Sequence, residues 1–199
     1  AIPRKKESPR RRGIFGVQQR AADPAVPVLQ PASGWAGEAV TLTDQHVLAT
    51  VPGSNELVCL DLLSGHIHWK APRENSLYVA GVLEDRVLLA GELKVRCLSL
   101  ADGKPLWKEP LSIPCPSGRG FIRNGVLYLP VPEGGILLVD TATGSRIRFA
   151  GLPGNVTPGN IVGTRGVLLS ADGDRLQAMP LPLPPDSRPA ESPQERSMQ

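Results

Sequence analysis

The stretch LDLLSGHIHWK at residues 60–70 recurs as LSLADGKPLWK at residues 98–108 and, less closely, as VDTATGSRIRF at residues 139–149. The copies follow one another at a period of about forty residues, and each places a glycine turn after an apolar run. A fixed period of this length in β-type sequence is typical of a propeller, in which each copy forms one blade. The chain is therefore predicted to be an array of one supersecondary unit.

A second marker keeps the same period. A Val-Leu pair opens an apolar run four times, at steps of 40, 39 and 41 residues: Val47, Val87, Val126 and Val167. Because two independent markers share one period, the chain is predicted to hold four such units.

The turn inside the repeat has its own chemistry. Gly65 supplies the positive φ that a tight turn between two strands needs. Asp61 and Ser64 have short polar side chains that can accept hydrogen bonds from the free backbone amides of the turn. Trp69 follows four residues after the glycine, and its indole is expected to face back along the blade.

The pattern Asp61-x-x-Ser64-Gly65-x-x-x-Trp69 resembles the repeat of the bacterial pyrroloquinoline-quinone-type, or quinoprotein-like, β-propellers. The resemblance covers roughly residues 37–180 and implies that the tryptophan docks between neighbouring blades. In the third copy Arg148 stands where the family has tryptophan, with Phe149 beside it, and the first two copies match more fully. The structural repeat residues are therefore predicted to be Asp61, Gly65, Trp69, Gly103, Trp107, Asp140 and Gly144.

The fold class is predicted to be an all-β, quinoprotein-like β-propeller of about 3.75 four-stranded blades. The blades are expected at residues 37–71, 76–109, 118–150 and 159–180, within a domain at residues 31–182, and residues 104–109 are expected to form the outer strand of the second blade. The fourth blade lacks an outer strand because a run of prolines starts at Pro180. Either the chain is a partial arc of a larger propeller, or residues 26–30 supply the missing strand and close a four-bladed ring.

The two ends of the chain differ in composition from the repeats. The first twenty residues hold seven Arg or Lys and one Glu, so the net charge of +3 belongs to a basic, flexible arm at residues 1–30. Since the repeats show no basic face, nucleic acid is not predicted as a partner, while attachment of the arm to an anionic membrane surface stays open. Residues 183–199 are predicted to be a proline-rich disordered tail.

No chemical constellation stands out. Cys59 and Cys97 occupy the same repeat position and are expected to pack as small apolar residues. His66 and His68 could face one way as a metal clip, but no third ligand lies nearby in the sequence, and His46 lies at a strand start. No catalytic, cofactor-binding or metal-ligating residue is predicted, and no run is apolar enough for a membrane span or a signal peptide. Since the chain begins with Ala, an excised or partial sequence is expected.

The leading functional hypothesis is a non-enzymatic module that binds protein partners. The resemblance is to the non-enzymatic branch of the family, that of the outer-membrane assembly propeller lipoprotein, and it implies a place in the cell envelope or periplasm. Enzymes of the family hold a quinone and calcium with an adjacent cysteine pair, a stacking tryptophan and acidic ligands, none of which maps here, so no cofactor is predicted. Two alternatives remain: a fragment of a quinone-dependent dehydrogenase whose cofactor site lies in absent blades, or the sensory part of a larger receptor.

Overall fold

The computed structural model describes residues 39–51, 53–173 and 175–184. These residues form strands and one short 3₁₀ helix, η1 (Pro153–Asn155). Blade 1 contains β1 (Ala39–Leu42), β2 (His46–Thr50), β3 (Glu56–Asp61) and β4 (Ile67–Pro72), and blade 2 contains β5 (Ser76–Leu83), β6 (Arg86–Gly91), β7 (Lys94–Ser99) and β8 (Leu111–Ser112). Blade 3 contains β9 (Phe121–Arg123), β10 (Val126–Val131), β11 (Gly135–Asp140) and β12 (Arg146–Gly151), and blade 4 contains β13 (Asn160–Thr164), β14 (Val167–Asp172) and β15 (Arg175–Pro180).

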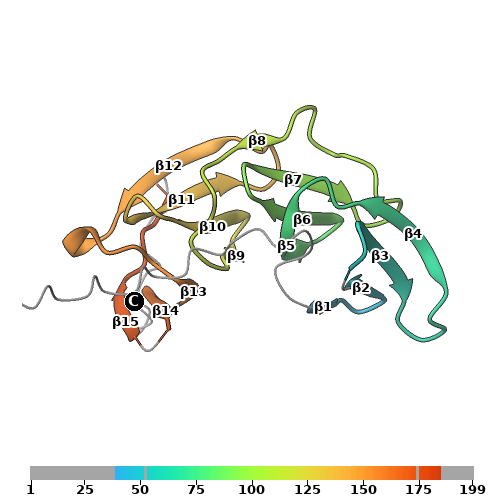
Figure 1. The fold of residues 1–199 in the computed structure, drawn as a ribbon, viewed down its shortest axis with the longest axis horizontal. Coiled ribbons are helices and arrows are strands. Elements are labelled where there is room, and N and C mark those ends of the chain that lie inside the picture. The colour runs from blue at the N-terminus through green and yellow to red at the C-terminus, as the bar shows by residue number, and fades with distance from the viewer. Residues whose placement is uncertain (1–38, 52, 174, 185–199) are drawn as a thin grey trace, which may run out of the picture.

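Each blade is an antiparallel meander in which the strands pair in chain order. Blades 1 to 3 have four strands and blade 4 has three, so among the described residues no strand pairs with the outer edge of β15. The sheets follow one another in an open arc, with blades 1 and 4 at its two ends (Figure 1). The predicted all-β propeller arc, with an incomplete fourth blade, is confirmed.

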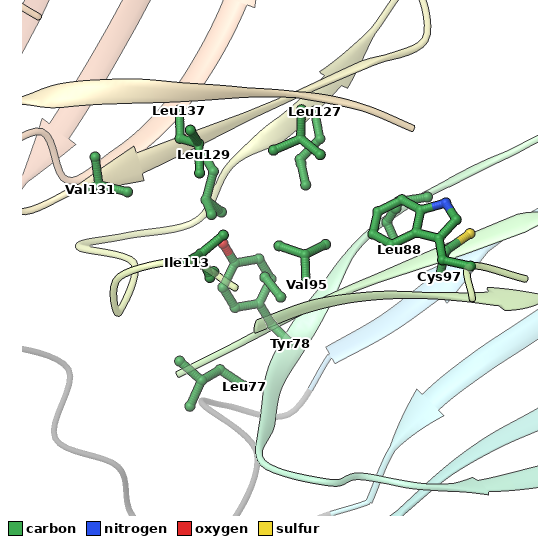
Figure 2. Close-up of a cluster of buried hydrophobic side chains, with 13 residues drawn as sticks. Leu77, Tyr78, Leu88, Val95, Cys97, Ile113, Leu127, Leu129, Val131 and Leu137 are labelled. Carbon is green, nitrogen blue, oxygen red and sulfur yellow. The ribbon is translucent and has the colours of Figure 1, made fainter. Parts of the chain in front are cut away.

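The apolar core lies between the blades, because alternate side chains of each strand point to opposite faces of its sheet. One cluster joins blades 1 and 2, a second joins blades 2 and 3, and a third joins blades 3 and 4. In the second cluster, side chains of blade 3 such as Leu129 and Val131 face Tyr78 and Val95 of blade 2 (Figure 2). Each inner blade is therefore buried on both faces.

The outer strand of blade 2 differs from the prediction. Residues 104–109 make a single bridge, Pro105 with Leu98, and pairing with the inner strand resumes only where Leu111 lies opposite Val95. The outer strand advances six residues between these two pairs while β7 advances three, so it carries three extra residues in a wide bulge. Pro105 and Pro110 have no N–H to donate to a ladder, which explains why regular pairing fails between them.

In two blades, the residue that marks the start of the repeat lies one position later than predicted. Val47 pairs with Leu60 and Val87 pairs with Leu98, each just before the polar residue of the turn. The equivalent pairs in blades 3 and 4 start from Leu127 and Leu168, not from Val126 and Val167. The Val-Leu marker found the correct period but the wrong residue there. In blade 3 either apolar neighbour fits, because β10 is buried on both faces, and in blade 4 Val167 and Leu168 are both apolar although only Leu168 is buried.

Several predictions fall outside the described residues. The basic arm at residues 1–30, the closing strand at residues 26–30 and the tail from residue 185 onward all lie there. Within the described ranges, no helix is long and apolar enough to cross a bilayer.

Candidate functional site

The repeated aspartate closes its own turn. In blade 1, Asp61 Oδ1 accepts hydrogen bonds from the amides of Leu63 at 3.2 Å and Ser64 at 2.7 Å, and from the Ser64 hydroxyl at 2.6 Å. The Ser64 hydroxyl is the main reason why the pKa of Asp61 lies below its ordinary value. Asp140 makes the same contacts with Ala142 and Thr143 in blade 3. Both carboxylates are therefore occupied by turn amides.

Trp69 of β4 joins blade 1 to blade 2. Its indole is buried, and Nε1 donates a hydrogen bond to the carbonyl oxygen of Leu100 at 2.7 Å. The ring lies on Gly103, where an added Cβ would sit 2.6 Å from the indole Cε3 atom. Gly103 is thus required both for this close approach and for its φ of +71°.

Trp107 makes the same contact one blade further on. It lies in the bulge of the outer strand, is buried, and donates from Nε1 to the Thr141 carbonyl oxygen at 3.2 Å. Its ring lies on Gly144, where an added Cβ would come within 2.7 Å of the indole. In both cases the tryptophan of one blade meets the turn glycine of the next.

At the junction of blades 3 and 4 a guanidinium takes the place of the indole. Arg148 lies opposite Leu138 in the ladder, as Trp69 lies opposite Cys59. The Arg148 side chain is exposed, and its Nη1 donates a long hydrogen bond of 3.4 Å to the Leu183 carbonyl oxygen. A polar contact to the segment that follows β15 is made in place of the turn contact, and the buried aromatic surface is lost.

The cysteine and histidine side chains that the structure describes are spread over several strands and loops. Burial raises the pKa of Cys59 and of Cys97 to about 11, so both are neutral thiols at physiological pH. His46 and His68 have ring centroids 5.1 Å apart, a proximity that sequence reasoning missed because His46 lies on another strand. Among the described residues, no three His, Cys, Asp or Glu side chains are placed to hold a metal ion.

A cavity of about 250 Å³ opens between blades 2 and 3, and we call it the blade 2–3 groove. Its lining includes apolar residues of strands β10 and β11 and two residues of opposite charge. The lining residues are Pro114, Val131, Glu133, Leu137, Arg146 and Phe149.

Phe149 is the unusual residue of this groove. Blades 1 and 2 have Lys70 and Lys108 at its repeat position, five residues after the turn glycine. The Phe149 ring lies over Gly135, where a Cβ would collide with it, and 48% of the residue's surface remains exposed. Sequence reasoning noted Phe149 only as a neighbour of Arg148. The signal that could have marked the site is an aromatic residue replacing a repeat lysine, paired with a glycine on the adjacent strand.

Arg146 stands beside this ring. It lies opposite Val139 in the ladder, so its side chain is on the blade 2 side, and Nη2 donates to the Ser112 carbonyl oxygen at 3.3 Å. In the described part of the chain, no carboxylate forms an ion pair with Arg146. The groove therefore combines an exposed aromatic ring with a cation that has no described counter-ion.

A smaller cavity of about 140 Å³ lies under the bulge of blade 2 and is lined in part by Arg96. The Arg96 guanidinium donates to the carbonyl oxygens of Pro72 at 2.9 Å and Arg73 at 2.8 Å. Its Nη1 also lies 3.1 Å from Glu74 Oε2. These contacts tie the link between blades 1 and 2 to β7, which assigns Arg96 a structural role.

Comparisons with known proteins agree with this geometry. A family model described as "Outer membrane protein assembly factor BamB" matches residues 18–159. Comparison with curated protein sequences finds no significant match.

Solved structures show the same fold. BamB from Moraxella catarrhalis aligns with a TM-score of 0.58 and 18% identity, over 71% of this chain and 45% of that one. The computationally designed Ika4 protein aligns with a TM-score of 0.58 and 12% identity, over 81% of this chain and 100% of that one. The computationally designed Ika8 protein aligns with a TM-score of 0.54 and 13% identity, over 71% of this chain and 46% of that one. The match thus spans less than half of the Moraxella chain.

Proposed function

The chain belongs to the family of the outer membrane protein assembly factor BamB, and from this premise we propose that it is a non-catalytic scaffold that binds protein partners in the cell envelope. The propeller supplies a rigid frame for such a role. Asp61 and Asp140 are held by the amides of their own turns. Cys59, Cys97 and Arg96 pack at blade junctions, and a scaffold needs no reacting group.

The blade 2–3 groove is the proposed partner site, and the observation that carries this proposal is the exposed ring of Phe149. An aromatic side chain held on a glycine offers a large apolar contact without losing much conformational entropy on binding. Lysine at the equivalent position of blades 1 and 2 would not offer that contact. Among the three outer strands that the structure describes, only that of blade 3 has an aromatic residue at this position. This distinguishes the junction of blades 2 and 3 from the junction of blades 1 and 2.

The cation of the groove indicates one contact that a ligand can make. Arg146 on one side has no described counter-ion and can pair with a carboxylate of the partner. We therefore propose an extended peptide segment that places an apolar side chain against Phe149 and an acidic side chain against Arg146. A cavity of about 250 Å³ suits one such anchoring side chain rather than a large cofactor.

The test is a cross-linking capture from bacterial envelope extract with three baits: the wild-type chain, Phe149→Lys and Lys108→Ala. Phe149→Lys restores the residue of the other blades, and Lys108→Ala changes the same repeat position in blade 2. Proteins captured by the wild type and by Lys108→Ala, but lost with Phe149→Lys, are expected. Equal capture by all three baits would reject the groove, and recovery of the bait alone would reject the scaffold.

A separate assay addresses catalysis. The 199-residue chain, and any longer polypeptide that contains it, is incubated with pyrroloquinoline quinone and calcium and tested for dye-linked oxidation of alcohols and sugars. No turnover above the background without protein is expected. Turnover would overturn the non-catalytic proposal and favour the dehydrogenase fragment.

A further inference from the structure

Each blade of this arc has two faces, which we call the backward face, toward the preceding blade, and the forward face, toward the following blade. The forward faces of blades 1 to 3 are covered, and three equivalent ladder positions in each are buried. These are Leu48, Leu57 and Cys59 in blade 1, Leu88, Val95 and Cys97 in blade 2, and Tyr128, Ile136 and Leu138 in blade 3.

Blade 4 keeps the same apolar chemistry at these positions. Leu169 pairs with Ala178, and Leu176 pairs with Ala171, in the register of the other blades. Leu168 and Ile161 are buried against blade 3, so their neighbours along each strand point to the forward face. There Leu176 is 71% exposed, and Val162 and Val167 are exposed as well. Blade 4 thus presents an uncovered blade–blade interface.

Blade 1 presents the complementary surface at the other end. Val40 and Leu42 of β1 pair with Ala49 and Val47, and this places them on the backward face of the sheet. Val40 is 65% exposed, whereas Val79, its counterpart in blade 2, is 8% exposed because blade 1 covers it. The backward face of blade 1 is therefore an interface of the same kind without its partner.

At every junction inside the chain, a forward face packs on a backward face. The two uncovered faces are one of each kind, and the matched part of the arc corresponds to 45% of the Moraxella BamB chain. We propose that a second copy of this chain covers both faces. In a two-fold arrangement blade 4 of each copy packs on blade 1 of the other, and the two arcs close into one ring.

The proposal accounts for features that a free arc leaves unexplained. Without further blades on either side, a single copy would leave two apolar sheet faces in water at the same time, which is unfavourable. The described residues that the register places on the blade 4 face carry no charge: Asn160, Val162, Thr164, Val167, Leu169, Ala171, Leu176, Ala178 and Pro180. The second copy is a partner whose backward face is apolar and of the kind that covers a forward face at every junction inside the chain.

The test is sedimentation equilibrium of the full 199-residue chain over a wide range of concentrations. The expected mass is twice the 21.2 kDa of the chain. Leu176→Arg on blade 4 and Val40→Arg on blade 1 are each expected to abolish the dimer, because each puts charges into both interfaces. The control is Leu63→Arg, which changes a turn residue that is 96% exposed and off both faces, and it should remain dimeric. Circular dichroism verifies that each variant is folded.

Mixing the two monomeric variants tests the geometry. In a mixed dimer, blade 4 of the Val40→Arg chain and blade 1 of the Leu176→Arg chain are both unchanged, so one of the two interfaces is restored. Partial recovery of the dimer is expected in the mixture.

A wild-type chain that stays monomeric at all concentrations would overturn the proposal and point to further blades of a longer polypeptide as the occupant. Loss of the dimer with only one of the two variants would overturn the forward-to-backward pairing. Neither outcome bears on capture of partners by the blade 2–3 groove.

Discussion

The junction between blades 2 and 3 and the junction between blades 3 and 4 use the same backbone positions with different side chains. At the first, Trp107 is buried on Gly144 and its indole donates to the next turn. At the second, Arg148 is exposed and makes one long hydrogen bond to Leu183. Since the net stabilisation by a hydrogen bond is small compared with burial of an indole, Trp107 is expected to stabilise the first junction more than Arg148 stabilises the second.

The same comparison explains where the exposed aromatic residue of blade 3 comes from. Blades 1 and 2 have a tryptophan followed by a lysine, and blade 3 has Arg148 followed by Phe149. Because successive strand residues point to opposite faces, this exchange moves the aromatic ring from the forward face to the groove beside blade 2. A residue type that joins blades elsewhere is thereby available to a partner.

The largest effect is expected from Trp107→Ala. Removal of the buried indole should lower the free energy of unfolding by about 3–5 kcal/mol, since the cavity lies between two blades. Chemical denaturation of the wild type and the variant measures it. Phe149→Ala is the control, and a smaller loss is expected because about half of that ring is already exposed. An unchanged denaturation midpoint for Trp107→Ala would contradict the docking account.

The next largest effect is expected at two turn glycines. It separates the free energy that the left-handed turn conformation requires from the free energy of the contact with the indole. Gly65 and Gly103 have nearly the same φ, +69° and +71°, but a Cβ meets nothing within 4 Å at Gly65 and meets Trp69 at Gly103. Gly65→Ala should cost about 1–2 kcal/mol for the left-handed backbone alone. Gly103→Ala should cost about 1–3 kcal/mol more because of overpacking against the indole. Equal losses in denaturant titrations would mean that the indole is not seated on Gly103.

A smaller effect is expected at the third junction. Arg148→Ala removes an exposed side chain with one long hydrogen bond, and the loss should be at most about 1 kcal/mol. The same denaturant titration measures it, with the neighbouring Arg146→Ala as a control for loss of charge. A loss as large as that of Trp107→Ala would show that the guanidinium holds blade 4 as strongly as an indole would.

The smallest effect is expected on the stability of the protein at acid pH. The pKa of Asp61 is below its ordinary value of 3.8, chiefly because the Ser64 hydroxyl donates to it. The folded chain therefore binds this proton less readily than the unfolded chain, so the stabilisation is present above the ordinary pKa and is lost as pH falls through the folded value. Asp61→Asn should flatten the decline in stability below about pH 4. Thermal melts at acid and neutral pH measure it, and an identical acid decline in both proteins would refute the assignment.

The repeat made the fold predictable from the sequence. The side-chain contacts at the individual blade junctions were harder to predict. The turn glycine and the tryptophan recur with fixed spacing because the tryptophan of one blade lies on the turn glycine of the next, so period and motif could be recognised without coordinates. The bulge around Trp107 was missed because the spacing from Gly103 to Trp107 looks regular, although regular pairing fails between Pro105 and Pro110.

The groove was not predicted because it depends on contacts between strands. Phe149 and Gly135 are fourteen residues apart, and only the β11–β12 register places the ring over the glycine. Likewise, Arg146 reaches Ser112 across a blade boundary that no local pattern encodes. Contacts repeated in every blade leave a sequence pattern, whereas a contact made once in the arc does not.

Hydrogen exchange tests most directly whether the tryptophan contacts join blades 1 to 3 into one cooperative unit that excludes blade 4. The Leu176→Arg chain is used, since its blade 4 face is free of any partner. The account predicts that amides of β14 exchange through local opening at a lower free energy than amides of β6 and β10, which exchange only on global unfolding. Equal protection in all four blades would contradict it and would show that Arg148 anchors blade 4 as firmly as the tryptophans anchor the others.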